Sequence, residues 1–93
     1  MTRQKVYQLI DGERNYQNFW DEKRTSETSV KGGAQLLDRD KPVEAWILWM
    51  ENYLLDARTL ATKSLDKDAA LEAIRKVAAL AVACMEYNDT LPR

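Results

Sequence analysis

The stretch PVEAWILWMENYLLDARTLA, residues 42 to 61, decides the fold, because it carries apolar side chains around most of a helix circumference. At about 100° per residue, one broad apolar stripe runs along such a helix, and Leu48 and Leu55 fall almost opposite it. The stripe consists of Val43, Trp46, Ile47, Met50, Tyr53, Leu54, Ala57 and Ala61. Two apolar sides need two packing partners, so we expect this segment in the middle of the fold, with its second side at a subunit interface.

Two further helices are predicted around this segment. Residues 3 to 24 place apolar side chains at helical spacing, and residues 67 to 87 form an alanine-rich helix. The short turn Ser64 to Asp66 supplies a cap for the last helix and makes helices 42–63 and 67–87 an antiparallel hairpin. The last helix is expected to bury Ala70, Leu71, Ile74, Val77, Ala78, Ala81, Val82, Cys84 and Met85. The prediction is a single all-α domain over residues 1–93, a helical hairpin with an added N-terminal helix.

Residues 25 to 41 lack a helical period and contain two adjacent glycines, so they are predicted to be a loop. Loops of such length in compact domains are often lids or binding loops. Lys31, beside Gly32 and Gly33, is a candidate phosphate contact, although a flexible tether is the commoner explanation for adjacent glycines. Asp40 is expected to cap the helix that begins near Pro42, or to favour its positive end.

Composition excludes several functions. The 14 Lys and Arg residues balance 15 Asp and Glu residues, which leaves no positive field to hold DNA. The chain has no histidine, the usual general base and zinc ligand, and its one cysteine, Cys84, lies in an apolar run. No segment is long and apolar enough to be predicted as a membrane span. The first residues also lack the apolar core that a signal peptide needs. We therefore expect a cytoplasmic protein that binds neither DNA nor membranes and oligomerises.

Carboxylates are the remaining candidates for chemistry. Glu13 falls within the apolar stripe of the first helix, where a carboxylate needs a partner, and pairing with an arginine of another helix is the simplest explanation. Glu44 and Glu51 share one helix face, but Asp56 lies about 140° from Glu51 around the helix. These acids cannot converge on one ion, so a solvated face is favoured over a metal site, and no cofactor is expected.

Three segments carry a resemblance to a known family. They are ERNYQ at 13–17 followed by Trp20, WILWMENYLLDA at 46–57, and RKVAALAVACME at 75–86. Together they resemble the compact MazG-like proteins of phages, a class of all-α nucleotide pyrophosphohydrolases. The resemblance implies an all-α fold, a nucleotide-sized pocket and residence in the host cytoplasm. Where that family carries a cluster of glutamates on its second helix, this chain has Asn52, Tyr53 and Asp56, and Ala73 stands where the third helix carries an acid.

A second likeness covers only the last helix. The segment Ala70 to Arg75 is similar to the helical hairpin of phage anti-CBASS sponges, small oligomeric proteins that sequester cyclic nucleotides. The N-terminal element of that family is absent here, so no ligand-binding residue is transferred from it.

These observations support three hypotheses. In the first, the chain binds a small nucleotide, such as a host immune signal, and sequesters it without hydrolysis. Aromatic rings would stack on the base, cations would hold the phosphate and amides would read the base edge. The candidate ligand-binding residues are Glu13, Arg14, Tyr16, Gln17, Trp20, Lys31, Trp49, Asn52, Asp56 and Arg75.

The other two hypotheses use other residues. A Mg²⁺-dependent pyrophosphohydrolase would need a rearranged acid set of Glu13, Glu51 and Asp56. A helical inhibitor of a host protein would instead use an exposed apolar patch. That patch would consist of Leu48, Trp49, Leu55 and Leu60.

Overall fold

A computed structural model describes the backbone of residues 1–31 and 37–93 and the side chains of residues 1–23 and 37–93. It confirms the all-α fold: α1 spans Arg3–Lys31, α2 spans Val43–Thr62, α3 spans Lys67–Asn88, and a short 3-10 helix, η1, spans Asp38–Asp40. The described residues include no β-strand. No described helix is long and apolar enough to cross a membrane.

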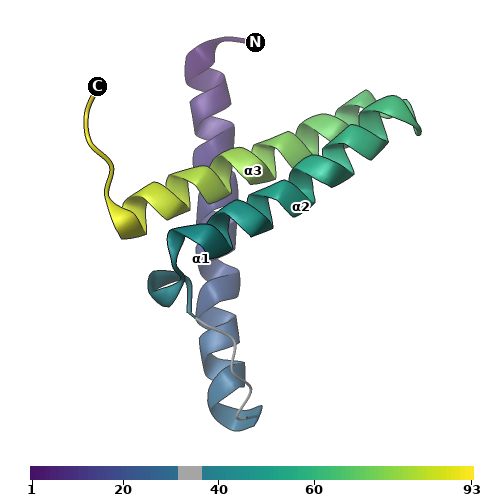
Figure 1. The fold of residues 1–93 in the computed structure, drawn as a ribbon. Helices are drawn as coiled ribbons and strands as arrows, with labels where there is room; N and C mark the ends of the chain where they lie inside the picture. Colours follow the sequence, from purple (N-terminus) through teal and green to yellow (C-terminus); the bar gives the residue numbers. More distant parts are fainter. Residues whose placement is uncertain (32–36) are drawn as a thin grey trace.

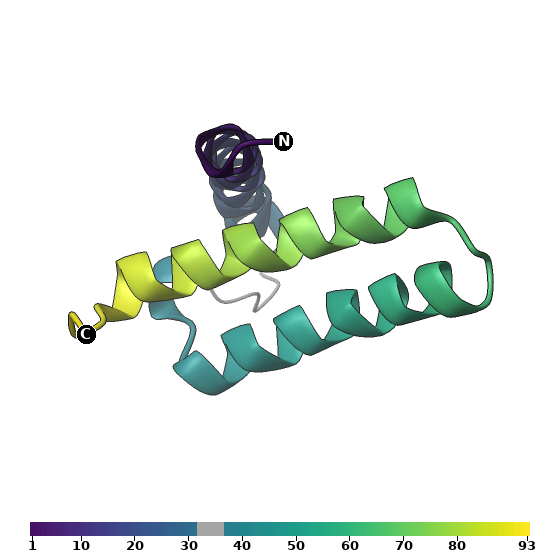
Figure 2. The same ribbon diagram turned by 90° about the horizontal axis from the view of Figure 1, so that it is seen from above.

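The two C-terminal helices form the predicted antiparallel hairpin, and α1 crosses it at a steep angle (Figure 1). Seen from above, α1 is viewed nearly end-on and lies beside α3 rather than α2 (Figure 2). Its middle rests on the hairpin, and its two ends extend past the hairpin on opposite sides. This crossing brings Glu13, Arg14 and Gln17 of α1 into hydrogen-bonding contact with α3.

The hairpin turn follows from its local sequence. The Asp66 side chain accepts a hydrogen bond from the Ala69 amide at 3.0 Å and so caps α3, as predicted. Leu65, just before it, has a positive φ of 52°, a left-handed conformation that an L-residue adopts at a cost. The Asp66 amide donates to the Leu60 carbonyl at 2.8 Å, which closes the end of α2.

The core lies between α2 and α3 and is centred on Trp46, which is fully buried. Its ring stacks on those of Trp49 and Tyr87, with centroids 5.6 and 6.1 Å away. Leu80 and Ala83 of α3 complete the buried cluster, and Met50, Tyr53 and Cys84 pack against it. The alanines of α3 allow the backbones of the hairpin to approach closely, and the large rings of α2 fill the remaining space.

The start of α2 is held by a buried ion pair. Lys41 Nζ lies 2.8 Å from the carboxylate of Asp38, which is 2% exposed, and 4.0 Å from the centre of the Trp49 ring. The Asp38 amide in turn donates to the Asp21 carboxylate of α1 at 3.2 Å. The predicted cap by Asp40 is wrong: Pro42 occupies the cap position without a side-chain hydrogen bond, because Asp40 belongs to η1.

Two other predictions need correction. The loop predicted from residue 25 begins later, since α1 continues to Lys31 despite the polar residues 25–29. The face of α3 expected to be buried is also partly wrong. Leu71, Ile74 and Met85 are 51, 47 and 46% exposed, whereas Ala73, Ala79, Leu80 and Ala83 are buried. The periodic pattern marks α3 as apolar on several sides but does not say which side meets α2.

Candidate functional site

Two adjoining grooves open where α1 crosses the hairpin. The first, which we call the aromatic groove, has a volume of about 220 Å³. It is lined by Glu13, Tyr16, Gln17, Trp20, Trp49, Tyr53, Lys76 and Leu80. The second, the charged groove, has a volume of about 490 Å³ and is lined by Leu9, Gly12, Glu13, Tyr16, Glu72, Arg75 and Lys76. Because the grooves share Glu13, Tyr16 and Lys76, one ligand can occupy both.

Tyr16 offers the most open ring of the aromatic groove. It is 56% exposed and meets Trp20 edge to face, with centroids 6.1 Å apart. The Trp20 ring also has Lys23 Nζ 4.8 Å from its centre. Trp49 stacks on Trp46 and is covered by Lys41 Nζ, so it forms a wall rather than a free stacking surface. A planar ligand would therefore stack on Tyr16.

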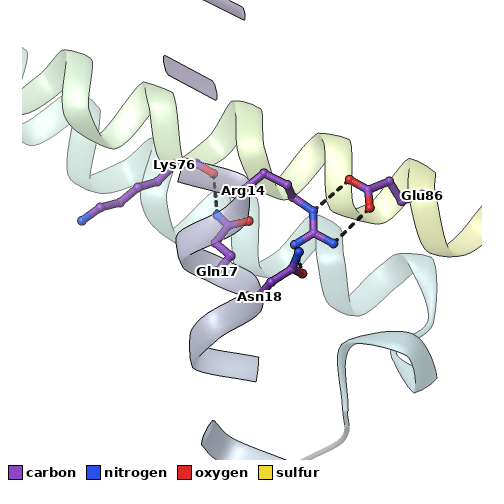
Figure 3. A network of polar contacts seen from close by, with 5 residues as sticks. All are labelled: Arg14, Gln17, Asn18, Lys76 and Glu86. Atoms are coloured by element: carbon purple, nitrogen blue, oxygen red, sulfur yellow. Dashed lines mark hydrogen bonds and ion pairs between the residues drawn. The ribbon is translucent and has the colours of Figure 1, made fainter. Parts of the chain in front are cut away.

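Gln17 presents a buried hydrogen-bond acceptor at this groove. Its amide nitrogen donates to the Lys76 backbone carbonyl at 3.5 Å, as Figure 3 shows. Its Oε1 atom is buried and has no hydrogen-bond partner among the described residues. An unpaired buried acceptor costs about 1 to 3 kcal/mol. Oε1 has almost no exposed area, so a ligand donor recovers that free energy only after the Gln17 side chain turns this atom toward the groove. Trp46 Nε1 is similarly unpaired but belongs to the core.

The charged groove contains a partly buried ion pair. Arg75 Nε donates to Glu13 Oε1 at 3.0 Å, and the Glu13 side chain is 8% exposed. This bond confirms the prediction that Glu13 pairs with an arginine from another helix. A second carboxylate, that of Glu72, lies 3.5 Å from the same guanidinium but is 61% exposed. Exposed pairs contribute little, so Glu72 is the carboxylate that an incoming anion would displace.

Lys76 is the remaining cation that lines both grooves. Its Nζ atom lies 5.6 Å from the centre of the Tyr53 ring. Among the described side chains, no carboxylate forms an ion pair with it. In Figure 3 its side chain extends away from the Arg14–Glu86 pair. Lys76 is thus placed to contact an anionic ligand from either groove.

Arg14 has a structural position outside both grooves. It is 4% exposed. Its guanidinium donates hydrogen bonds to both carboxylate oxygens of Glu86, at 2.9 and 3.2 Å, and a third to the side chain of Asn18. It also lies 5.6 Å from the centre of the Tyr87 ring. Burial by itself lowers the pKa of Arg14, but hydrogen bonding to Glu86 and Tyr87 outweighs it and raises that pKa above its ordinary value. Arg14 therefore fixes α1 to the end of α3 as a permanent cation.

The crossing of α1 over the hairpin brings together six of the predicted ligand-binding residues. Five line the aromatic groove: Glu13, Tyr16, Gln17, Trp20 and Trp49. Arg75 lines the charged groove. Asn52 and Asp56 are exposed on α2 and line neither, because the neighbouring Tyr53 takes the groove side of that helix. The Lys31 side chain lies outside the described part of the structure.

The polar lining residues Tyr53, Glu72 and Lys76 were not among the predicted ligand-binding residues. Tyr53 was assigned to the apolar stripe of residues 42–61. A signal was present for Lys76, because it precedes Leu80 by one helical turn and so shares its side of α3. The partner helix of that side, α1, could not be inferred from the periodicity.

The acids of the described residues lie apart from one another. Within the described part of the chain, no three Asp, Glu or Cys side chains gather as candidate ligands for an ion. Glu13 is engaged by Arg75, while Glu51 and Asp56 are exposed on α2. The rearranged acid set required by a hydrolase is therefore separated across two helices.

Comparisons with protein-family models, curated proteins and solved structures found no match. The chemistry of the two grooves is accordingly the basis for assigning a function. They combine an open phenol ring, an unpaired amide oxygen, a lysine and an arginine held by a displaceable carboxylate. Such a set suits a ligand with a flat polar ring at one end and an anion at the other.

Proposed function

We propose that this protein binds a small nucleotide in the two grooves and sequesters it without hydrolysis. The base would stack on Tyr16 in the aromatic groove, where its exocyclic amino group would donate to Gln17 Oε1. The observation that carries the proposal is this unpaired buried acceptor beside an open aromatic ring. The charged groove falls within the volume range typical of small-molecule sites, and the aromatic groove adds space for a base.

The phosphate would occupy the charged groove. Lys76 would contact it directly, and Arg75 would turn its second nitrogen from Glu72 to the phosphate while keeping its bond to Glu13. A phosphate can replace an exposed carboxylate on an arginine because guanidinium binds both anions in the same paired geometry. Glu13 would then act as a positioning residue that holds Arg75 rather than as a ligand.

Sequestration is favoured over hydrolysis because of the placement of the acids. Mg²⁺-dependent cleavage of a phosphoanhydride needs several oxygen ligands around one ion. Glu51 and Asp56 are exposed on α2 and line neither groove. The resemblance to MazG-like phage proteins is consistent with this proposal. It implies a nucleotide-sized pocket, while the acidic cluster of that family is missing from this chain. A host immune signal remains one candidate ligand.

A thermal-shift panel tests the proposal. Linear and cyclic nucleotides are added at 1 mM with and without Mg²⁺, and a ligand that binds only the folded state raises its melting temperature. We expect a rise with adenine nucleotides that is larger than with inosine nucleotides, which lack the exocyclic amino group. Chromatography of the same mixtures should show the nucleotide intact. No shift with any nucleotide rules out the proposal, and release of product favours the hydrolase instead.

Tyr16→Ala provides the residue-level test. Stacking of a base on an aromatic ring contributes about 1 to 3 kcal/mol, so affinity should fall roughly 5- to 150-fold. Tyr7→Ala is the matched control, because Tyr7 is 63% exposed on the same helix and lines neither groove. Isothermal titration calorimetry measures both. Equal affinity in the two variants would exclude Tyr16 as the stacking surface.

A further inference from the structure

The single chain exposes more surface than a compact protein of its size. Its accessible area is 7218 Å² for 10.8 kDa, whereas a compact monomer of that mass exposes about 5,500 Å². Its radius of gyration is 14.8 Å, against about 12 Å for a compact domain of 93 residues. The excess area, about 1,700 Å², falls within the range that each subunit of an obligate homodimer buries.

The first part of α1, residues 3–12, forms an arm that extends beyond the hairpin (Figure 1). In proteins, most of the stability of a helical segment comes from packing of its apolar side chains. Yet Val6 and Leu9 are 39 and 38% exposed, and Leu71 and Ile74 on the adjacent side of α3 are 51 and 47% exposed. Four large apolar side chains therefore lie open where the two helices meet.

These side chains surround a third groove, of about 310 Å³. We define the arm face as the apolar lining contributed by α1 and α3: Val6, Leu9, Ile10, Leu71, Ile74 and Ala78. Asp68, Glu72 and Arg75 border this lining. An apolar centre with a charged border is the usual composition of a protein interface.

We propose that the arm face is the interface with a second copy of this chain, in a symmetric dimer that packs arm face against arm face. The excess area matches what such a dimer buries. A net charge of -1 per chain adds almost no repulsion between identical subunits. A twofold axis presents the same patch on both subunits, so each copy would cover the apolar residues that the other leaves open.

The arm face differs from the interface expected from the sequence, which lies on α2 around Leu48 and Leu55. Those leucines are 62 and 53% exposed, but they project from a helix already packed against α3. The arm face instead lines a groove, and a second copy bound there would pack against the N-terminal part of α1, residues 3–12. Leu9, Glu72 and Arg75 line both this groove and the charged groove, so a second copy would border the charged groove.

Sedimentation velocity of the full chain and two variants tests the interface. The wild type is expected to be a dimer at 20 μM. Ile74→Glu places a charge at the centre of the arm face and should yield a monomer with helical circular dichroism retained. Leu55→Glu, the matched control on α2, should leave the dimer intact. A monomeric wild type, a dimeric Ile74→Glu protein, or loss of the dimer in Leu55→Glu alone would each overturn the proposal.

Hydrogen exchange of the unmodified chain covers the case in which Ile74→Glu fails to fold. Amides of residues 3–12 should exchange at least tenfold more slowly at 200 μM than at 1 μM, because dimerisation would suppress opening of the arm. Amides in the middle of α2 serve as the internal reference. Equal exchange of residues 3–12 at both concentrations contradicts the arm face as an interface.

Discussion

At the scale of single residues, Arg14 and Gln17 are close on α1 but have different environments. Arg14 has its charge matched by Glu86, its planar group covered by Tyr87 and its third nitrogen satisfied by Asn18. Gln17 has one end of its amide bonded and the other buried without a partner. Full satisfaction is typical of a structural residue, whereas an unpaired buried atom calls for an explanation, such as a bound water or a ligand.

Arg14→Leu is expected to destabilise the fold by about 2 kcal/mol, the scale of hydrogen bonds between charged groups. Urea denaturation measures this loss, with Arg58→Leu, an exposed arginine of α2, as control. Because the pKa of Arg14 is raised in the folded state, its charge contributes fully at every pH below its unfolded pKa and is lost only as the pH rises through the folded pKa. Arg14 itself therefore adds no pH dependence to the free energy of unfolding between pH 6 and 9. Equal stability of the two variants would contradict the structural role.

Some residue-level features were predictable from the sequence and others were not. A carboxylate within an apolar stripe requires a counter-charge, so the partner type of Glu13 followed from its position, and Arg75 is that partner. The groove position of Lys76 did not follow, because it depends on where α1 crosses α3. Contacts between helices distant in sequence are set by packing that periodicity alone does not encode.

At the scale of elements, α3 shows what an apolar pattern leaves open. Four of its alanines are buried, at positions 70, 73, 79 and 83, while Leu71, Ile74 and Met85 are about half exposed. The hairpin itself was predictable, since the short turn with Asp66 permits little else. The length of α1 was not, because residues 25–29 have polar side chains that favour caps and turns over helix interiors, yet the helix passes through them.

The cap of α3 provides a prediction at this scale. Asp66→Ala removes the acceptor for the Ala69 amide and should cost about 1 kcal/mol. For a domain of this size, that loss lowers the melting temperature by roughly 4 to 8 °C. Asp56→Ala, an exposed aspartate within α2, is the control and should not lower it. An unchanged melting temperature in Asp66→Ala would show that the hairpin turn does not depend on this cap.

At the scale of the whole molecule, the crossing of α1 over the hairpin determines where the three grooves lie. It creates the aromatic and charged grooves from three helices and leaves the arm of α1 beside α3 (Figure 2). The same crossing separates Glu13 from the exposed acids of α2. The proposed binding of a small ligand and the proposed association with a second copy thus depend on the same crossing.

If a nucleotide binds where α1 crosses the hairpin, ¹⁵N chemical-shift mapping during titration with ADP and cyclic AMP will detect it at individual residues. We expect saturable shifts in the amides of residues 12–17 and 72–76, in the Gln17 side-chain amide and in the Trp20 indole N–H. The amides around Leu48 and Leu55 should stay unchanged. Shifts confined to that outer side of α2, or no shifts with either nucleotide at millimolar concentration, would contradict it.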